Sequence, residues 1–283
     1  MRLAHQGVLL FSLGVLFESL MDTVAKLVST SYPLPQILLF RCACGLIPLL
    51  LYVAIRNNYS ANTLLYKSRL QVTRAILLGL TFCAYVYSLK YLSMITALAL
   101  FLTLPFFMII VSSIFHNEKI TVRSVFLTSG GFIGAIFIIQ PDFSDYGLVM
   151  FLPVLAAILT AFLLSISKTL SEKLDPISIN INSTFFLFIV SLPFALFVWE
   201  PVHTKDFAPL LLIGIFGGIA LLTMTAALVM ARMSLLAPFQ YFSVVWASFF
   251  GWIIWADTPT LVTCFGIALV IFSGMATTAQ HSE

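Results

Sequence analysis

The chain has 283 residues, of which 61% are apolar and only 9% are charged, whereas soluble domains carry about 25% charged residues. This composition excludes a soluble globular protein and indicates an integral membrane protein. The net charge of +3 is spread over short segments rather than gathered in one patch, so nucleic acid is not an expected partner.

Long apolar segments divide the chain into ten predicted membrane-spanning helices. Each segment is about 18–25 residues long, which is the length of helix needed to cross about 30 Å of hydrocarbon. Asp175-Pro176 and Thr258-Pro259 place a capping side chain before a proline, as is typical of helix starts. The predicted spans are 5–27, 34–56, 71–90, 92–115, 121–140, 146–168, 176–199, 208–231, 234–255 and 259–278.

The distribution of Lys and Arg predicts which side of the membrane each loop faces. Basic residues favour the cytoplasmic side, and a cytoplasmic N-terminus places most of them there. Both termini are therefore expected in the cytoplasm. The cytoplasmic side would receive Arg2, Arg56, Lys67, Arg69, Arg74, Lys119, Arg123, Lys168, Lys173 and Arg232, and the outer side only Lys26, Lys90 and Lys205.

The second half of the chain repeats landmarks of the first at an offset of about 140 residues. Lys26 and Lys168 end the first and sixth spans, and each is followed within ten residues by a proline that opens the next span. Because each half holds five spans, the two halves would insert with opposite orientations. The sequence therefore predicts an all-α membrane protein with a 5+5 inverted repeat, with repeats at 1–140 and 141–283, and such repeats are typical of transporters.

Two acidic residues lie inside the first predicted span. Glu18, Asp22 and Lys26 are spaced four residues apart and would share one face of a helix. A carboxylate inside a bilayer is costly unless it is paired, hydrated or protonated. Glu18 and Asp22 are therefore candidates for binding substrate or protons.

Arg41 lies at a similar depth in the second span. Arg41 could pair with one acid and hold the first two spans together, while Lys26 holds Asp22, which would leave Glu18 free to titrate or bind substrate. At the repeat offset, Glu18 aligns near Thr160, Asp22 near Leu164 and Arg41 near Asn182. Because the second half packs without these charges, they favour function over architecture.

Aromatic and proline residues supply further candidates. Rings beside acids would bind an organic cation by cation–π attraction or a flat base by stacking, although simple packing is the alternative for each ring. Pro105 and Pro238 lie in the fourth and ninth spans and could act as gating flexure points or fix static kinks. The candidate contacts with a polar group are Tyr85, Tyr87, Gln240, Tyr241 and Trp246.

No enzyme signature is found in the sequence. The four histidines are scattered, and the four cysteines lie inside apolar spans without metal-site spacing. A nucleophile motif of the Gly-x-Ser-x-Gly type is also missing. We therefore expect neither catalysis nor a metal or other cofactor.

The chain combines ten short spans in a 5+5 repeat with Asp22-x-x-x-Lys26, Phe40-Arg41, Pro105 and the following Glu118. With these features it resembles the drug/metabolite transporter superfamily, and within it the EamA-type members. The segment from Asp22 to Arg41 is most similar to bacterial S-adenosylmethionine uptake transporters. The resemblance implies a central cavity lined by spans 1, 3, 4, 6, 8 and 9, with spans 5 and 10 packed outside it. The short, compact loops suit a bacterial inner membrane, where we expect the protein.

These features predict a secondary transporter that moves a small organic metabolite by alternating access. The leading expectation is uptake of a cationic or zwitterionic metabolite such as S-adenosylmethionine, coupled to protons or to a counter-transported metabolite. The alternatives are an exporter of amino acids or toxic amphipathic compounds on the same scaffold, and a facilitative pore or interaction subunit. The expected partners are the substrate and the lipid bilayer, with the protein acting as a monomer or homodimer.

Overall fold

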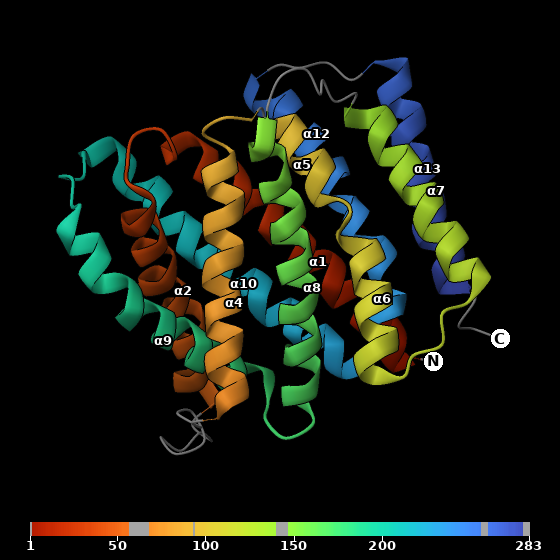
Figure 1. Cartoon of the computed structure of the whole chain (residues 1–283), viewed down its shortest axis with the longest axis horizontal. Helices are drawn as coiled ribbons and strands as arrows, with labels where there is room; N and C mark the ends of the chain where they lie inside the picture. The colour runs from red at the N-terminus through yellow and green to blue at the C-terminus, as the bar shows by residue number, and fades with distance from the viewer. Residues whose placement is uncertain (1, 57–67, 93, 140–146, 256–259, 280–283) are drawn as a thin grey trace.

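The computed structural model describes the chain except for residues 1, 57–67, 93, 140–146, 256–259 and 280–283. The described residues form helices and contain no strand (Figure 1). In chain order the elements are α1 (Arg2–Val28), α2 (Leu34–Arg56), α4 (Arg69–Ser88), α5 (Met94–Phe101), α6 (Leu104–His116), α7 (Val122–Ile139), η1 (Gly147–Met150), α8 (Phe151–Ser171), α9 (Pro176–Phe197), η2 (Thr204–Asp206), α10 (Phe207–Met230), α11 (Met233–Leu236), η3 (Ala237–Tyr241), α12 (Phe242–Trp255) and α13 (Leu261–Ala279).

Every predicted span overlaps one of these helices or a broken run of them. Eight helical segments of the described chain are long and apolar enough to cross a membrane. The apolar stretches of α7 and α13, at Val122–Phe137 and Leu261–Ser273, are shorter. The structure thus supports a multi-pass membrane protein, while the count of ten spans stays a prediction.

Polar side chains start several helices where the sequence places them. Asp175 Oδ1 accepts hydrogen bonds from the backbone N–H groups of Ile177 and Ser178, at 3.1 and 3.3 Å, and so caps α9. Thr121 Oγ1 accepts a hydrogen bond from the N–H of Ser124 at 3.1 Å at the start of α7. These caps confirm the predicted starts of α7 and α9; the corresponding cap at Thr258 lies outside the described residues.

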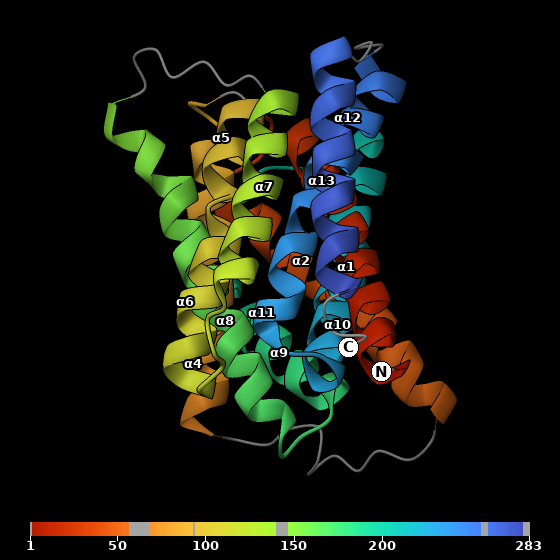
Figure 2. The same cartoon turned by 90° about the vertical axis from the view of Figure 1, so that its right-hand side faces the viewer.

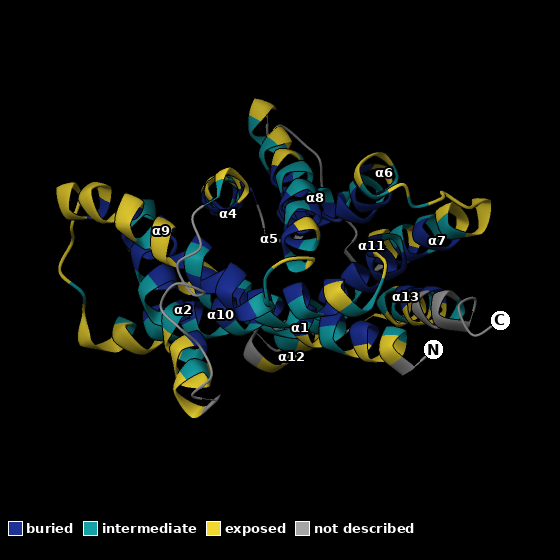
Figure 3. Ribbon diagram, turned by 90° about the horizontal axis from the view of Figure 1, so that it is seen from below, coloured by how far each residue is buried: buried dark blue, intermediate teal, exposed yellow. Residues whose placement is uncertain are grey.

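The helices run between two ends of the molecule, with α1 and α8 in opposite directions (Figures 1 and 2). The main packing partners are α1 with α10, α8 with α4, and α2 with both α9 and α10. Buried residues are concentrated on α1, α8 and α10 (Figure 3). Large apolar side chains such as Phe126, Phe197 and Leu261 are exposed on the outer helices, as expected for surfaces in contact with lipid.

The helices α7 and α13 pack against each other at one edge of the molecule (Figure 3). They correspond to the fifth and tenth predicted spans, for which the resemblance implies a position outside the central helices. Glycines allow their close approach, since a Cβ at Gly134 would lie 2.9 Å from the carbonyl oxygen of Gly266.

The fourth and ninth predicted spans are broken in the structure. α5 ends at Phe101 and α6 begins at Leu104, with Pro105 in the first turn of α6. The ninth span begins with the short α11, passes through the 3-10 segment η3, which contains Pro238, and continues as α12. Both prolines therefore lie at breaks, where the missing N–H of proline costs no helical hydrogen bond.

One end of the molecule gathers most of the basic residues. It is the end at which α6 connects to α7, α8 to α9 and α10 to α11 (Figure 1), and we call it the basic end. Lys119, Arg123, Lys168, Lys173 and Arg232 lie in or beside these helix ends, and Arg69 begins α4 at the same end of the molecule. α1 begins and α13 ends on the same side (Figure 2).

Arg74, counted above among the basic residues of the cytoplasmic side, is buried and does not lie at the surface. Its side chain is fully buried within α4. Its guanidinium donates to Ser167 Oγ and Ser183 Oγ and Asn180 Oδ1, each at 2.7 Å, and to the Ile179 carbonyl and Thr225 Oγ1 at 3.3 Å. The sequence could not reveal this, because the acceptors come from three other helices, α8, α9 and α10.

Glu118, after α6, joins three helices at the basic end. Its carboxylate forms an ion pair with Lys168 of α8 and accepts hydrogen bonds from the N–H groups of Met233 and Ser234 at 3.1 and 2.9 Å. Ser234 Oγ donates to it at 2.5 Å. Burial raises the pKa of Glu118, but the bonds from Lys168 and Ser234 outweigh it and lower the pKa to about 2. The group is therefore ionised at neutral pH.

Candidate functional site

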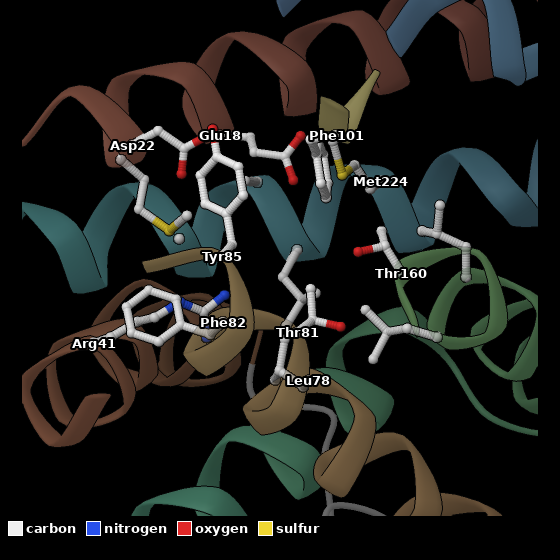
Figure 4. A pocket seen from close by; sticks show the side chains of 16 residues that line it. Glu18, Asp22, Arg41, Leu78, Thr81, Phe82, Tyr85, Phe101, Thr160 and Met224 are labelled. Atoms are coloured by element: carbon white, nitrogen blue, oxygen red, sulfur yellow. The ribbon is translucent and has the colours of Figure 1, made fainter. Parts of the chain in front are cut away.

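A cavity of about 70 Å³ lies at the centre of the helices (Figure 4). Small-molecule sites usually measure about 300–1,000 Å³, so a metabolite of ordinary size would enter only after the surrounding helices separate. Helices α1, α4, α8 and α10 supply most of the wall, and α2 and α5 supply one residue each. The lining residues are Glu18, Met21, Asp22, Arg41, Leu78, Thr81, Phe82, Tyr85, Phe101, Thr160, Leu163, Leu164, Gly217, Ala220, Leu221 and Met224.

Glu18 and Asp22 both line the cavity. They lie one turn apart on α1, and both face the cavity because residues four apart share a helix face. Both side chains are half-buried. Glu18 Oε2 accepts a hydrogen bond of 2.8 Å from Gln240 Nε2, which reaches it from η3. Within the described chain, no hydrogen bond or ion pair joins the Asp22 carboxylate to another residue.

Arg41 lines the same cavity from α2 and is 9% exposed. Its guanidinium carbon lies 4.8 Å from the centre of the Phe82 ring, a cation–π contact. The charges of Asp22 and Glu18 act on it, yet no ion pair within 4.0 Å connects Arg41 to any acid of the described residues. The close ion pair considered for Arg41 is therefore not formed in this conformation.

Three further polar groups face the cavity. Tyr85 extends from α4 towards the two acids, with its ring centroid 5.1 Å from that of Phe101 (Figure 4). The hydroxyls of Tyr85 and Thr81 have no hydrogen-bond partner. Thr160 Oγ1 donates to the Ala156 carbonyl of its own helix, α8, at 2.8 Å. Sequence reasoning missed Thr81, a lone threonine in an apolar span, which carries no signal of its own.

Positions related by the predicted repeat meet in this cavity. Glu18 and Asp22 line it from α1, and Thr160 and Leu164 line it from α8. Figure 4 shows Thr160 on the opposite wall from Glu18. The offset read from the sequence therefore identifies two facing walls of one site, one charged and one neutral.

The other predicted contacts lie outside the cavity wall. Tyr87 is 42% exposed, and its hydroxyl is 3.1 Å from that of Tyr91. Tyr241 is fully buried in η3, 6.4 Å from the Phe132 ring of α7 between centroids. Trp246 stacks on Phe250 within α12. Of the predicted residues in the ninth span, Gln240 alone contacts an acidic residue of the cavity wall, because it donates a hydrogen bond to Glu18.

The prolines considered for gating also lie outside the wall, at the two helix breaks described above. The resemblance implied a cavity lined by spans 1, 3, 4, 6, 8 and 9. The structure adds Arg41 from the second span, and the ninth span contributes through Gln240. No group of three or more His, Cys, Asp or Glu side chains that could hold a metal ion is found among the described residues.

Three proteins named as transporters or exporters are similar to this chain. An S-adenosylmethionine uptake transporter of Rickettsia bellii is 27% identical over 94% of this chain and 90% of its own length. A riboflavin transporter of Brucella anthropi is 30% identical over 75% of this chain and 77% of its own. A pseudopaline exporter of Pseudomonas aeruginosa is 26% identical over 97% and 96%.

The fold and the family are shown by two further comparisons. A solved crystal structure superposes with a TM-score of 0.81 and covers 100% of this chain and 98% of its own, at 14% identity. The profile of the EamA-like transporter family matches residues 5–140 and 147–278. The chain therefore belongs to the EamA-like transporter family and is a multi-pass integral membrane protein.

Proposed function

We propose that this protein is a secondary active transporter that carries a small organic metabolite through the central cavity by alternating access. The leading substrate class is a cationic or zwitterionic metabolite, with S-adenosylmethionine as the first compound to test. The single observation that carries this proposal is the pair of carboxylates, Glu18 and Asp22, facing an internal cavity without an ion pair among the described residues.

A carboxylate that faces the cavity without an ion pair favours a role in transport over a role in packing. A charged group inside a membrane protein is normally paired, and an unpaired one marks a substrate or proton pathway. An ionised carboxylate at the cavity binds a cationic group, and the same carboxylate can release the substrate by taking up a proton. This exchange would couple transport to protons, and a counter-transported metabolite would use the same groups.

Access to the cavity would alternate between the two membrane faces. The repeats at 1–140 and 141–283 would rock against each other, with the breaks at Pro105 and Pro238 as flexure points. The opposite directions of α1 and α8 support this arrangement. The basic end would face the cytoplasm, together with both termini.

The residues of the ninth span have different proposed roles. Gln240 positions the Glu18 carboxylate through its 2.8 Å hydrogen bond. Tyr241 and Trp246 would contact substrate only if η3 and α12 move towards the cavity during the cycle. The exposed position of Tyr87 gives no support for a substrate contact.

Export of amino acids or toxic amphipathic compounds is the second candidate function. It is favoured by the similarity to a pseudopaline exporter over nearly the whole chain. The cavity would serve either direction, because the direction of net flux follows from the gradients rather than from the wall.

Flux measurements on the purified protein in liposomes test the proposal. Glu18→Gln and Asp22→Asn should each lower proton-driven uptake of labelled S-adenosylmethionine by about tenfold or more, because each removes a charge from the cavity. Tyr87→Phe, outside the cavity, should transport normally. Counterflow distinguishes a carrier from a pore, and full activity in both acid variants would refute the assigned role.

A further inference from the structure

Polar groups without partners point to what the cavity binds. More than nine-tenths of buried polar groups in proteins have a hydrogen-bond partner. Arg41 Nε, Thr81 Oγ1 and Tyr85 Oη are buried at the cavity and have none. Arg41 and Tyr85 are only 9% and 7% exposed. These groups are therefore available to a bound ligand.

Arg41 is suited to an anionic group. A guanidinium presents a planar fork of donors that matches a carboxylate. Contact with Phe82 fixes the position of this fork without using any of its N–H groups. Arg74 is the useful contrast, because its guanidinium is filled by five neutral acceptors and offers nothing to a ligand.

The acidic side chains of the cavity are separated from Arg41. Glu18 and Asp22 line the α1 wall, while Arg41 lies beside the Phe82 ring away from that wall, with Tyr85 between them (Figure 4). With both acids ionised, the cavity holds two negative charges and one positive charge, held apart by more than an ion-pair distance. A simple cation would leave Arg41 unmatched, and a simple anion would leave the acids unmatched.

We propose that the cavity binds a zwitterion of the amino-acid type, with its carboxylate on Arg41 and its cationic groups on Glu18 and Asp22. Thr81 and Tyr85 supply hydrogen bonds to the polar atoms between the two charged ends. This assignment rests on the proposed transport function and makes Arg41 the residue that determines specificity for a carboxylate. S-Adenosylmethionine has the matching pattern, because it carries a sulfonium, an ammonium and one carboxylate.

Matched ligand pairs test the role of Arg41. Each pair consists of an amino acid and its decarboxylated form: S-adenosylmethionine and decarboxylated S-adenosylmethionine, lysine and cadaverine, arginine and agmatine, and histidine and histamine. Affinities are measured by thermal-shift titration of the purified full chain, because a ligand that binds the native state raises its stability. We expect at least one amino acid to bind, and to bind at least about tenfold more tightly than its decarboxylated form.

Variants separate carboxylate recognition from general charge balance. Arg41→Gln should lower the affinity for the amino acid to that of its decarboxylated form and leave the decarboxylated form unchanged. Arg41→Lys keeps the charge but loses the fork, and should recover part of the difference. Thr81→Val provides a second, nearly isosteric test and should weaken both members. Arg69→Gln, at an exposed arginine of α4 outside the cavity wall, is the control.

Three results would overturn the proposal. The first is equal affinity of the wild type for an amino acid and its decarboxylated form. The second is an equal loss of affinity for the two compounds in Arg41→Gln. The third is that none of the four amino acids stabilises the protein. Flux into liposomes is measured separately with the same compounds. Carboxylate discrimination without flux would refute the transport proposal and retain the assignment of the site, so the two failures are distinguishable.

Discussion

Two arginines inside the helices have opposite environments. Arg74 donates hydrogen bonds to Ser167, Asn180, Ser183, Thr225 and a backbone carbonyl. These bonds connect α4 to α8, α9 and α10. Arg41 contacts the Phe82 ring, lines the cavity, and has a buried Nε without a hydrogen-bond partner. The sequence distinguishes these two arginines poorly, since each is a single arginine within an apolar segment. Which partners a buried side chain meets depends on how the helices pack.

Replacing Arg74 should destabilise the fold. Arg74→Gln removes a guanidinium and leaves buried acceptors on α8, α9 and α10 without donors, with an expected loss of about 3 kcal/mol or more. The matched control is Arg69→Gln, five residues earlier and exposed, which should change stability little. Thermal unfolding in detergent and the yield of monodisperse protein report the effect. Equal melting temperatures for the two variants would show that the Arg74 bonds contribute nothing.

At the scale of helices, the sequence predicts position better than regularity. Apolar length places α2 at 34–56, and the structure has Leu34–Arg56. The breaks between α5 and α6 and at η3 were not predicted as breaks, because a proline inside an apolar span is compatible with either a kink or an interruption. The side chains that reach the cavity across these breaks, Gln240 above all, depend on local backbone geometry that apolar periodicity does not encode.

The contact between α7 and η3 depends on one glycine. A Cβ at Gly131 would lie 2.5 Å from Cδ2 of the fully buried Tyr241, whereas nothing lies within 4 Å of a Cβ at the adjacent Gly130. Gly131→Ala should therefore destabilise the protein by about 1–3 kcal/mol through overpacking. Gly130→Ala should be neutral or stabilise by up to about 1 kcal/mol through helix propensity.

Thermal unfolding of the two alanine variants measures this difference directly. Because both substitutions add the same methyl group to the same helix, intrinsic helix propensity cancels in the comparison. A Gly131→Ala variant that is as stable as Gly130→Ala would mean that Tyr241 moves aside freely and that η3 is not held against α7.

For the whole molecule, the charged stretch of the first span predicted one wall of the cavity, the wall that holds Glu18 and Asp22. The family resemblance implied a second wall from the sixth span, and the structure identifies Thr160 and Leu164 as its residues there. Thr81 and the Phe82 contact that holds Arg41 could not be predicted, because they depend on how α2 and α4 face each other. Membership of the family indicates that the protein is a transporter. The substrate has to be inferred from the residues that line the cavity.

Access to Thr160 tests most directly whether the cavity is a transport chamber. Thr160→Cys is made in a chain whose four native cysteines are replaced, and membrane-impermeant thiol reagents are added from each side of oriented liposomes. Ala161→Cys, at the next and fully buried position of α8, is the control. If the cavity is a transport chamber, Cys at position 160 reacts from both sides, a bound zwitterion slows the reaction, and the control stays unlabelled. A folded Thr160→Cys variant that reacts from neither side would contradict this prediction and show a sealed packing seam.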